Sequence, residues 1–356
     1  MNVVGTRESL ALYSDWAYTS AVAGLTLALL LLSATFAIAR TRTLEKSTAP
    51  GVVARDSASP GVVVEMPRRS RTERLERAGI AVVFVSAVLL LMCIVLRGLA
   101  TSRAPWGNMY EFINLTCFCG LVAAAVVLRR PQYRSLWVFV LVPVLILLTV
   151  SGKWLYSHAA PVMPALQSYW LPIHVSVVSL GSGVFLVAGV ASILFLVKMS
   201  RLGQPGRTDL AGRIVSKLPD AQTLDRIAYR TTIFAFPVFG FGVIFGAIWA
   251  EEAWGRYWGW DPKENGALII VLWNVLILHA RLGGLVQARG LAVLVLGGNI
   301  VTAWSWFGVN QLSVGLHSYG FTDSASFWLM VFVLSQIAIC AAGLVPPRRW
   351  KSGCNT

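Results

Sequence analysis

The sequence contains few charged residues, and this scarcity limits the kind of protein it can encode. Only 13% of its 356 residues are charged, whereas 56% are hydrophobic, and the mean hydropathy is +0.67. Soluble domains of ordinary composition carry about 25% charged residues. The composition therefore excludes an ordinary soluble domain and indicates a chain that folds in a lipid bilayer.

The sequence also lacks the usual signals of soluble function. It has no internal repeat, no glycine-rich nucleotide-binding loop and no polar stretch long enough for a soluble domain. Four of its five cysteines (Cys93, Cys117, Cys119 and Cys340) fall inside apolar stretches. Cysteines in such positions are typically small packing residues, so we expect neither a zinc site nor a thiol-exchange site.

Long apolar runs are what the sequence has instead. A membrane-spanning helix needs about 20 mainly apolar residues. Nine windows approach this length, roughly at residues 17–38, 79–99, 112–129, 136–151, 173–197, 230–250, 265–281, 290–307 and 326–346. The pattern predicts an all-α, polytopic membrane bundle of about nine transmembrane helices, in which the short window 136–151 could be tilted or partly re-entrant.

The placement of basic residues predicts how the chain is oriented. There are 30 Lys and Arg against 16 Asp and Glu, which gives a net charge of +14. The basic residues concentrate in alternate loops, around 40–77, 129–134, 198–230, 281–289 and 348–351. The positive-inside rule makes these loops cytoplasmic, with the N-terminus outside and the C-terminus inside. We therefore expect the charge to serve topology and attraction to anionic lipids rather than nucleic-acid binding.

Composition also predicts a division of the chain. Residues 1–78 are expected to form a first transmembrane helix and a flexible basic cytoplasmic loop, which is rich in Ser, Thr, Pro and Arg. Residues 79–350 form the core that carries the unusual residues, and 351–356 form a tail. The absence of a transit peptide favours a bacterial plasma membrane.

The most unusual segment is a tryptophan-rich stretch within a predicted outward loop at 249–265, which contains WGRYWGWDPKEN at 254–265. Interfacial aromatic belts also enrich tryptophan but need no glycine spacing. Here Gly255 and Gly259 allow a tight turn that presents several indoles together. Such a cluster suits a large, flat, apolar ligand with a charged edge, which describes a porphyrin or a quinone.

Side chains of this loop are candidate ligand contacts. The candidate indoles are Trp254, Trp258 and Trp260. Arg256 and Lys263 could pair with ligand carboxylates, such as heme propionates. Asp261 is expected to orient the loop rather than to touch the ligand, although Asp-Pro is also a common turn starter and a purely structural role stays open.

The four histidines discriminate between the two ligand classes. His174, at the outer start of the fifth window, and His317, in the last outer loop, are predicted at the membrane level of the tryptophan-rich loop. Two imidazoles beside an aromatic bed match a six-coordinate heme iron, whereas a quinone needs no such pair. His279, near the inner end of the seventh window, either bonds a neighbouring helix or ligates metal together with a partner's histidine. His158 has no assigned role.

Several segments resemble the CcsA/ResC subunit of the System II cytochrome c synthase, a heme-handling family with a tryptophan-rich WWD motif. The likeness runs from about residue 100 to 346. The segments are PWGNMYEF at 105–112, LQSYWLPIHV at 166–175, WGRYWGWDPKENGAL at 254–268, LHARL at 278–282 and GVNQLSVGLHSYG at 308–320.

The resemblance implies a specific site and activity. His174 and His317 would be the external axial ligands of heme b, with the tryptophan-rich loop over it. His279 would be a membrane-embedded heme ligand whose second histidine comes from a ResB-type partner. With this partner and the thiol-reducing proteins of the same pathway, the chain would act as a heme lyase on apocytochrome c carrying Cys-x-x-Cys-His. The alternatives are a heme transporter or chaperone without synthase activity, and a metal-free quinone-binding assembly subunit.

Overall fold

The computed structural model describes residues 3–48, 70–204, 206–207, 209–309 and 315–317, with residues 334, 337, 338 and 341. Throughout these residues the regular structure is helical. Eight helices are long and apolar enough to cross a membrane. They are α1 (Val3–Thr48), α2 (Arg71–Thr101), α3 (Met109–Val127), α4 (Trp137–Trp154), α5 (Trp170–Met199), α7 (Ala221–Trp254), α8 (Pro262–Leu282) and α9 (Ala288–Ala303), which continues through the π-helical turn Trp304–Gly308.

The predicted membrane bundle is confirmed for the first eight windows. The short window 136–151 is a complete helix, because the 3-10 turn Pro131–Leu136 continues directly into α4. The ninth window, 326–346, lies almost wholly outside the described residues, as does the predicted tail. Of the predicted loop at 40–78, both ends continue α1 and α2, and residues 49–69 are outside the described range.

The helices begin and end where local residues satisfy the free backbone groups. The Asn108 side chain accepts a hydrogen bond from Glu111 N (2.9 Å) at the start of α3. The Asp220 side chain accepts one from Thr223 N (2.6 Å) at the start of α7. Gly255, at a positive φ of 70°, ends α7, a conformation that favours glycine. These caps determine how far each span projects beyond its apolar run.

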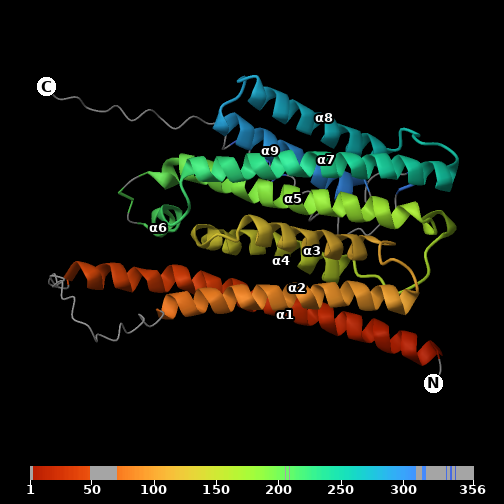
Figure 1. Cartoon of the computed structure of the whole chain (residues 1–356), viewed down its shortest axis with the longest axis horizontal. Coiled ribbons are helices and arrows are strands. Elements are labelled where there is room, and N and C mark those ends of the chain that lie inside the picture. The colour runs from red at the N-terminus through yellow and green to blue at the C-terminus, as the bar shows by residue number, and fades with distance from the viewer. Residues whose placement is uncertain are drawn as a thin grey trace, which may run out of the picture.

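The spans lie side by side in an elongated bundle (Figure 1). Helices α1 and α2 pack together along one edge, α8 and α9 along the other, and α5 contacts α3, α4, α7 and α9 between them. In α5 78% of the apolar window is buried inside the protein, against 28% in α8. The α5 helix is therefore the central element, and α8 presents much of its surface outward.

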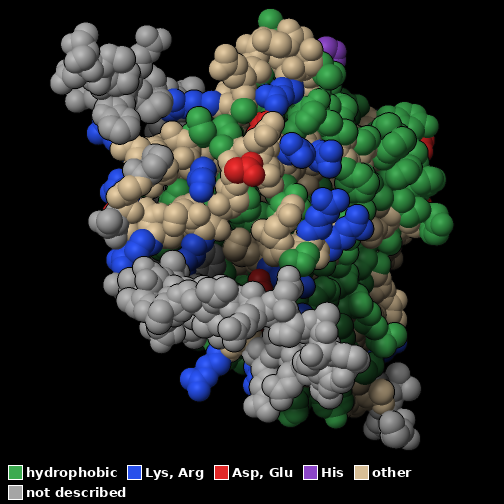
Figure 2. Space-filling view, turned by 60° about the vertical axis from the view of Figure 1, so that its left-hand side comes forward, with side chains coloured by type: hydrophobic (Ala, Val, Ile, Leu, Met, Phe, Trp, Pro, Cys, Tyr) green, Lys and Arg blue, Asp and Glu red, His purple; other side chains and the backbone are tan. Residues whose placement is uncertain are grey.

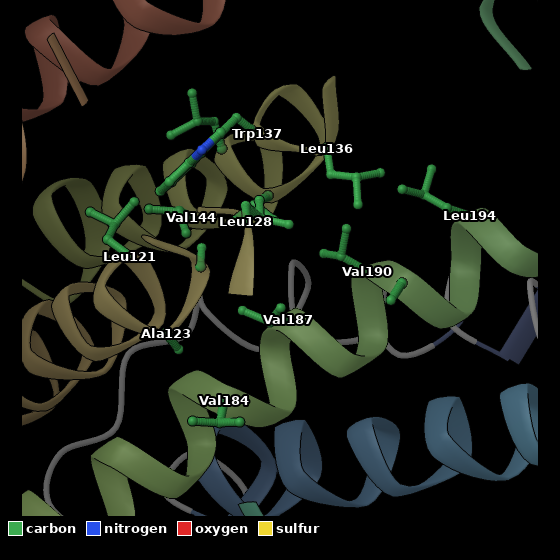
Figure 3. Packing of buried hydrophobic residues seen from close by; sticks show 14 of the residues in the cluster. Leu121, Ala123, Leu128, Leu136, Trp137, Val144, Val184, Val187, Val190 and Leu194 are labelled. Carbon is green, nitrogen blue, oxygen red and sulfur yellow. The ribbon is translucent and has the colours of Figure 1, made fainter. Parts of the chain in front are cut away.

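The core lies mainly between α3, α4 and α5. Figure 3 shows Val187 and Val190 of α5 beneath Leu128 and Trp137, which belong to the α3–α4 side of the interface. In the contact between α3 and α5 a Cβ on Gly183 would lie 2.5 Å from Gly120 N, so the two backbones touch. Such close approach is common where membrane helices pack. Cys93 and Cys117 are buried packing residues with free thiols.

The two ends of the bundle differ in charge. The end that carries α6 (Leu210–Ser216), called here the basic end, comes forward in Figure 2 and shows many Lys and Arg side chains with few acids. The opposite end, called here the site end, holds the connections α2–α3, α4–α5 and α7–α8. The basic loops, which alternate with the other loops along the sequence, therefore lie together at one end of the bundle.

Candidate functional site

A cavity opens at the site end, between α3, α5, α7 and α8. Its empty volume, with the open space at its mouth included, is about 1090 Å³. The lining is mostly apolar and includes the aromatic residues Trp106, Phe112, Trp249, Tyr257, Trp258 and Trp306. His174, Lys263, Glu264 and His317 provide its ionisable groups. This combination suits a large planar ligand with a charged edge.

His174 enters the cavity from the first turns of α5. Its Nδ1 lies 2.8 Å from the carbonyl oxygen of Gly242 in α7, and its ring is stacked on Trp249, with centroids 5.9 Å apart and planes inclined by 13°. A Cβ on Gly246 would lie 2.7 Å from the imidazole Cε1. The absence of a side chain at Gly246 therefore allows the imidazole to lie against the α7 backbone.

His317 lies in the described segment 315–317, which follows α9 in the sequence, and it lines the same cavity. Its Nδ1 lies 3.0 Å from Oδ1 of Asp261, and its side chain is 13% exposed. The ring meets Trp249 and Trp254 edge-on, at centroid distances of 5.4 and 4.8 Å. The Trp249 ring thus contacts both cavity histidines.

Asp261 connects the loop to His317. As the N-cap of α8 it accepts a hydrogen bond from Lys263 N (2.9 Å), and its second oxygen accepts one from Leu316 N (2.8 Å). Burial alone would raise the pKa of Asp261, but the hydrogen bonds from His317 and from these backbone groups lower it to about 2. Asp261 is therefore an ionised group that holds His317 and the start of α8 together.

The tryptophan-rich loop between α7 and α8 is stabilised from within. Glu264 Oε2 accepts hydrogen bonds from Gly259 N (2.7 Å) and Asp261 N (3.1 Å), which completes a capping box at α8. Trp260 adopts a positive φ of 59°, uncommon for a non-glycine residue. The loop is thereby bent back over the cavity, where Trp258 and Tyr257 line it.

The predicted contacts of this loop fall into two groups. Trp258 and Lys263 line the cavity, and Trp254 packs against His317. Arg256 and Trp260 are not among the described residues that line it. The Trp260 side chain is 70% exposed, and Arg256 Nη1 donates to Gly259 O (3.4 Å). The structure therefore brings together only part of the set that the sequence proposes.

Comparison with known proteins assigns the chain to a family. The family model for the cytochrome c assembly protein matches residues 106–317. The chain belongs to this family. The match starts at Trp106 and ends at His317, both of which line the cavity.

Curated proteins with similar sequences align with much of the chain's length. A cytochrome c biogenesis protein CcsA from Rippkaea orientalis is 32% identical over 311 residues, covering 71% of this chain and 90% of the relative. The CcsA proteins of Gloeobacter violaceus and Mesostigma viride are 33% and 29% identical. These alignments cover 63% and 69% of this chain, and 80% and 87% of the relatives.

A solved structure has the same fold. The chain resembles the cytochrome c heme lyase CcmF with a TM-score of 0.61 at 16% identity. The similarity covers 94% of this chain and 51% of that protein, so the chain spans about half its length. The cytochrome c assembly family assignment and this fold agree.

The third predicted ligand of this family member lies far from the cavity. His279 is separated from Lys263 by 16 residues of α8, or about 24 Å along the helix axis. It is exposed, and its Nδ1 lies 3.0 Å from Val275 O of its own helix. Ile269, Leu272 and Leu276 are exposed too, at the heptad spacing that His279 continues.

The three predicted ligands have one feature in common. In His174, His279 and His317 the Nδ1 faces an oxygen of a carbonyl or an ionised carboxylate, which can only accept a hydrogen bond. In the neutral ring Nδ1 therefore carries the hydrogen and Nε2 keeps its lone pair. This is the tautomer that a metal-ligating histidine adopts when a second group orients it.

A buried ionic cluster shapes the wall of the cavity. Glu111 accepts hydrogen bonds from Arg97 Nε (2.8 Å), Arg103 Nη1 (3.0 Å) and Gly107 N (2.7 Å). The side chains of Arg97 and Glu111 are 2% and 1% exposed. Because Gly107 and its neighbour Trp106 line the cavity, the cluster determines the position of that wall.

Sequence reasoning missed several lining residues. Trp249 begins the predicted outward loop but is not among its candidate indoles, and Trp106, Phe112 and Trp306 have no predicted role. Trp106 Nε1 lies 3.1 Å from both Pro172 O and Ser176 Oγ, which joins the segment before α3 to α5. Trp106 and Phe112 belong to PWGNMYEF, the one signal that could have found them. His158, also unassigned, lies edge-on to Tyr156.

Proposed function

We propose that this chain binds heme b in the site-end cavity, with His174 and His317 as axial ligands, and takes part in its covalent attachment to apocytochrome c. The observation that carries the proposal is the pair of orienting hydrogen bonds at these histidines, because both leave Nε2 available within one aromatic cavity. Membership of the cytochrome c assembly family supports the same reading. A quinone site would need neither feature.

The attachment chemistry requires orientation more than side-chain catalysis. Each acceptor thiol adds across one vinyl group, so that sulfur bonds the carbon next to the ring and the hydrogen goes to the terminal carbon, without an oxidant or reductant. Holding the reactants together replaces a dilute encounter, which can contribute about 7–11 kcal/mol. In this proposal the cavity walls hold the heme plane, and Lys263, which lines the cavity, pairs with a propionate.

We also propose that the inner ligand, His279, is completed by a ResB-type partner. Its position on the exposed stripe of α8 supports this proposal, because a polar side chain in that place is costly unless another helix covers it. In the same proposal the basic end is cytoplasmic, the site end is external and the membrane is a bacterial plasma membrane. Residues 79–350 then form the heme-handling core.

The absorption spectrum of the detergent-purified chain, co-expressed with its proposed partner, tests this function. We expect a low-spin bis-histidine heme spectrum in the wild type that is lost from the site-end cavity in His174→Ala and in His317→Ala. A folded wild-type chain without a Soret band would refute the heme proposal and favour the metal-free alternative.

A further inference from the structure

We propose that the two site-end histidines are unequal ligands, and that an incoming acceptor histidine displaces His174 while His317 stays on the iron. This inference rests on the proposed heme site. It concerns which iron–nitrogen bond breaks, and hence from which side of the porphyrin the apocytochrome approaches. The basis is the difference between the groups that hold each Nδ1.

His317 donates its Nδ1 hydrogen to a carboxylate. Asp261 Oδ1 lies 3.0 Å from Nδ1, and the Asp261 side chain is only 4% exposed. Backbone N–H groups of Lys263 and Leu316 hold both carboxylate oxygens in place. A buried anion at this distance increases the electron donation of the opposite nitrogen, so it strengthens the bond from Nε2 to iron.

His174 donates its Nδ1 hydrogen to a neutral group instead. The Gly242 carbonyl is 2.8 Å away inside α7, and it carries a dipole rather than a charge. Nε2 of His174 is therefore the weaker donor of the two. When two imidazoles compete for one iron with a third, the weaker donor leaves first.

The packing around the two rings favours the same order. His317 is enclosed by Asp261, Trp249 and Trp254, so it has little room to withdraw. The His174 ring already lies flat against Trp249 and against the bare backbone of Gly246. Once released from iron, His174 keeps its hydrogen bond and its stacking partner. The free energy of its unligated state is therefore only slightly raised.

The exchange itself is balanced. The bond between iron and His174 Nε2 breaks, and a bond between iron and the neutral acceptor histidine forms, with no change in charge or oxidation state. It follows that the acceptor segment reaches the porphyrin face that α5 and α7 border. The face below residues 315–317 stays covered by the retained ligand.

Cavity variants of the full-length chain, loaded with hemin, test the inference. We compare His174→Gly and His317→Gly by absorption and electron paramagnetic resonance, with His158→Gly as a matched control because it removes an exposed histidine at the same end. We expect His174→Gly to keep more than about half of the wild-type heme as a five-coordinate high-spin species. Added imidazole should return it to low spin. In His317→Gly heme occupancy should fall well below that of His174→Gly.

A second variant separates ligand strength from folding. Asp261→Asn keeps a hydrogen-bond acceptor but removes the charge. The midpoint potential of the iron should therefore rise, and added imidazole should displace His174 and His317 to the same extent. Equal heme loss in the two glycine variants, or retention only in His317→Gly, overturns the inference. A wild-type chain without a low-spin heme spectrum would instead refute the proposed function, whatever the variants do.

Discussion

The indole of Trp249 lies parallel to the imidazole of His174, at a centroid distance of 5.9 Å and an angle of 13°. Its Nε1 donates to Ala165 O at 3.1 Å, and the side chain is 2% exposed. The ring is therefore fixed at both its edge and its face. Because the same ring also meets His317, one indole determines the orientation of both proposed ligands.

Replacing Trp249 should weaken heme binding without removing a ligand. Each aromatic contact contributes about 0.5–1.5 kcal/mol beyond burial, and Trp249 contacts both histidines, so Trp249→Ala should lower hemin affinity about 5–150-fold. Trp249→Phe should recover part of the loss because it keeps a ring. Hemin titration by absorption measures both. Trp260→Ala, at a largely exposed position, is the control, and equal affinities in Trp249→Ala and wild type would contradict the role of Trp249.

The loop over the cavity should open when Glu264 is shortened. Glu264→Ala leaves the N–H groups of Gly259 and Asp261 without their acceptor, at a cost of about 1–3 kcal/mol per group. An equilibrium shifted by 1–2 kcal/mol changes by a factor of about 5–30. Trypsin should therefore cleave after Arg256 at least about fivefold faster than in the wild type.

The control for loop opening is a second acidic residue of the same end. Glu252 is exposed and accepts a hydrogen bond from Ser168 Oγ (2.6 Å). Glu252→Ala removes a carboxylate without touching the capping box, so its cleavage rate should match the wild type. Equal acceleration in both variants would show that the loop responds to surface charge rather than to the Glu264 contacts.

The spans and part of the site were predictable because they depend on composition and local pattern. Apolar runs of sufficient length identify membrane helices, and eight windows became helices. His174 and His317 were selected by residue type and predicted depth, and Trp258 and Lys263 by their place in the tryptophan-rich loop. All four line one cavity. The depth of a residue in the membrane follows from the order of spans and loops, so it can be predicted without knowing which helices are in contact.

Trp249 and Trp306 were not predictable as lining residues because helices that are apolar all round do not show which face turns inward. In the sequence Trp249 resembles a residue of an interfacial aromatic belt, because its place in the cavity depends on how α7 packs against α5. The predicted contacts Arg256 and Trp260 turn outward because the capping box and the positive φ of Trp260 bend the loop. Asp261 and His317 are 56 residues apart, and no local pattern links them.

The buried pair Arg97–Glu111 should contribute far more to stability than a surface pair. Glu111→Gln removes the close counter-charge of the buried Arg97 guanidinium and leaves only the longer contact of its Nη1 with Asp15 Oδ1 (3.9 Å), and breaking a buried pair costs about 3–5 kcal/mol. The exposed pair Arg77–Glu73 is the control, and Glu73→Gln should change stability by about 0–1 kcal/mol. Thermal unfolding in detergent, followed by circular dichroism, compares them, and similar effects would contradict the structural role of Glu111.

Two basic residues of the loop were candidates to pair with the propionates, and their positions favour Lys263. Lys263 lines the cavity, whereas Arg256 is exposed and donates to Gly259 O. A charged hydrogen bond contributes about 1.5–3 kcal/mol, so the wild type should bind hemin about 10–150-fold more tightly than its dimethyl ester. Lys263→Met should remove most of this preference, and Arg256→Met should preserve it. Loss of the preference in Arg256→Met alone would mean that the loop closes over bound heme and turns Arg256 inward.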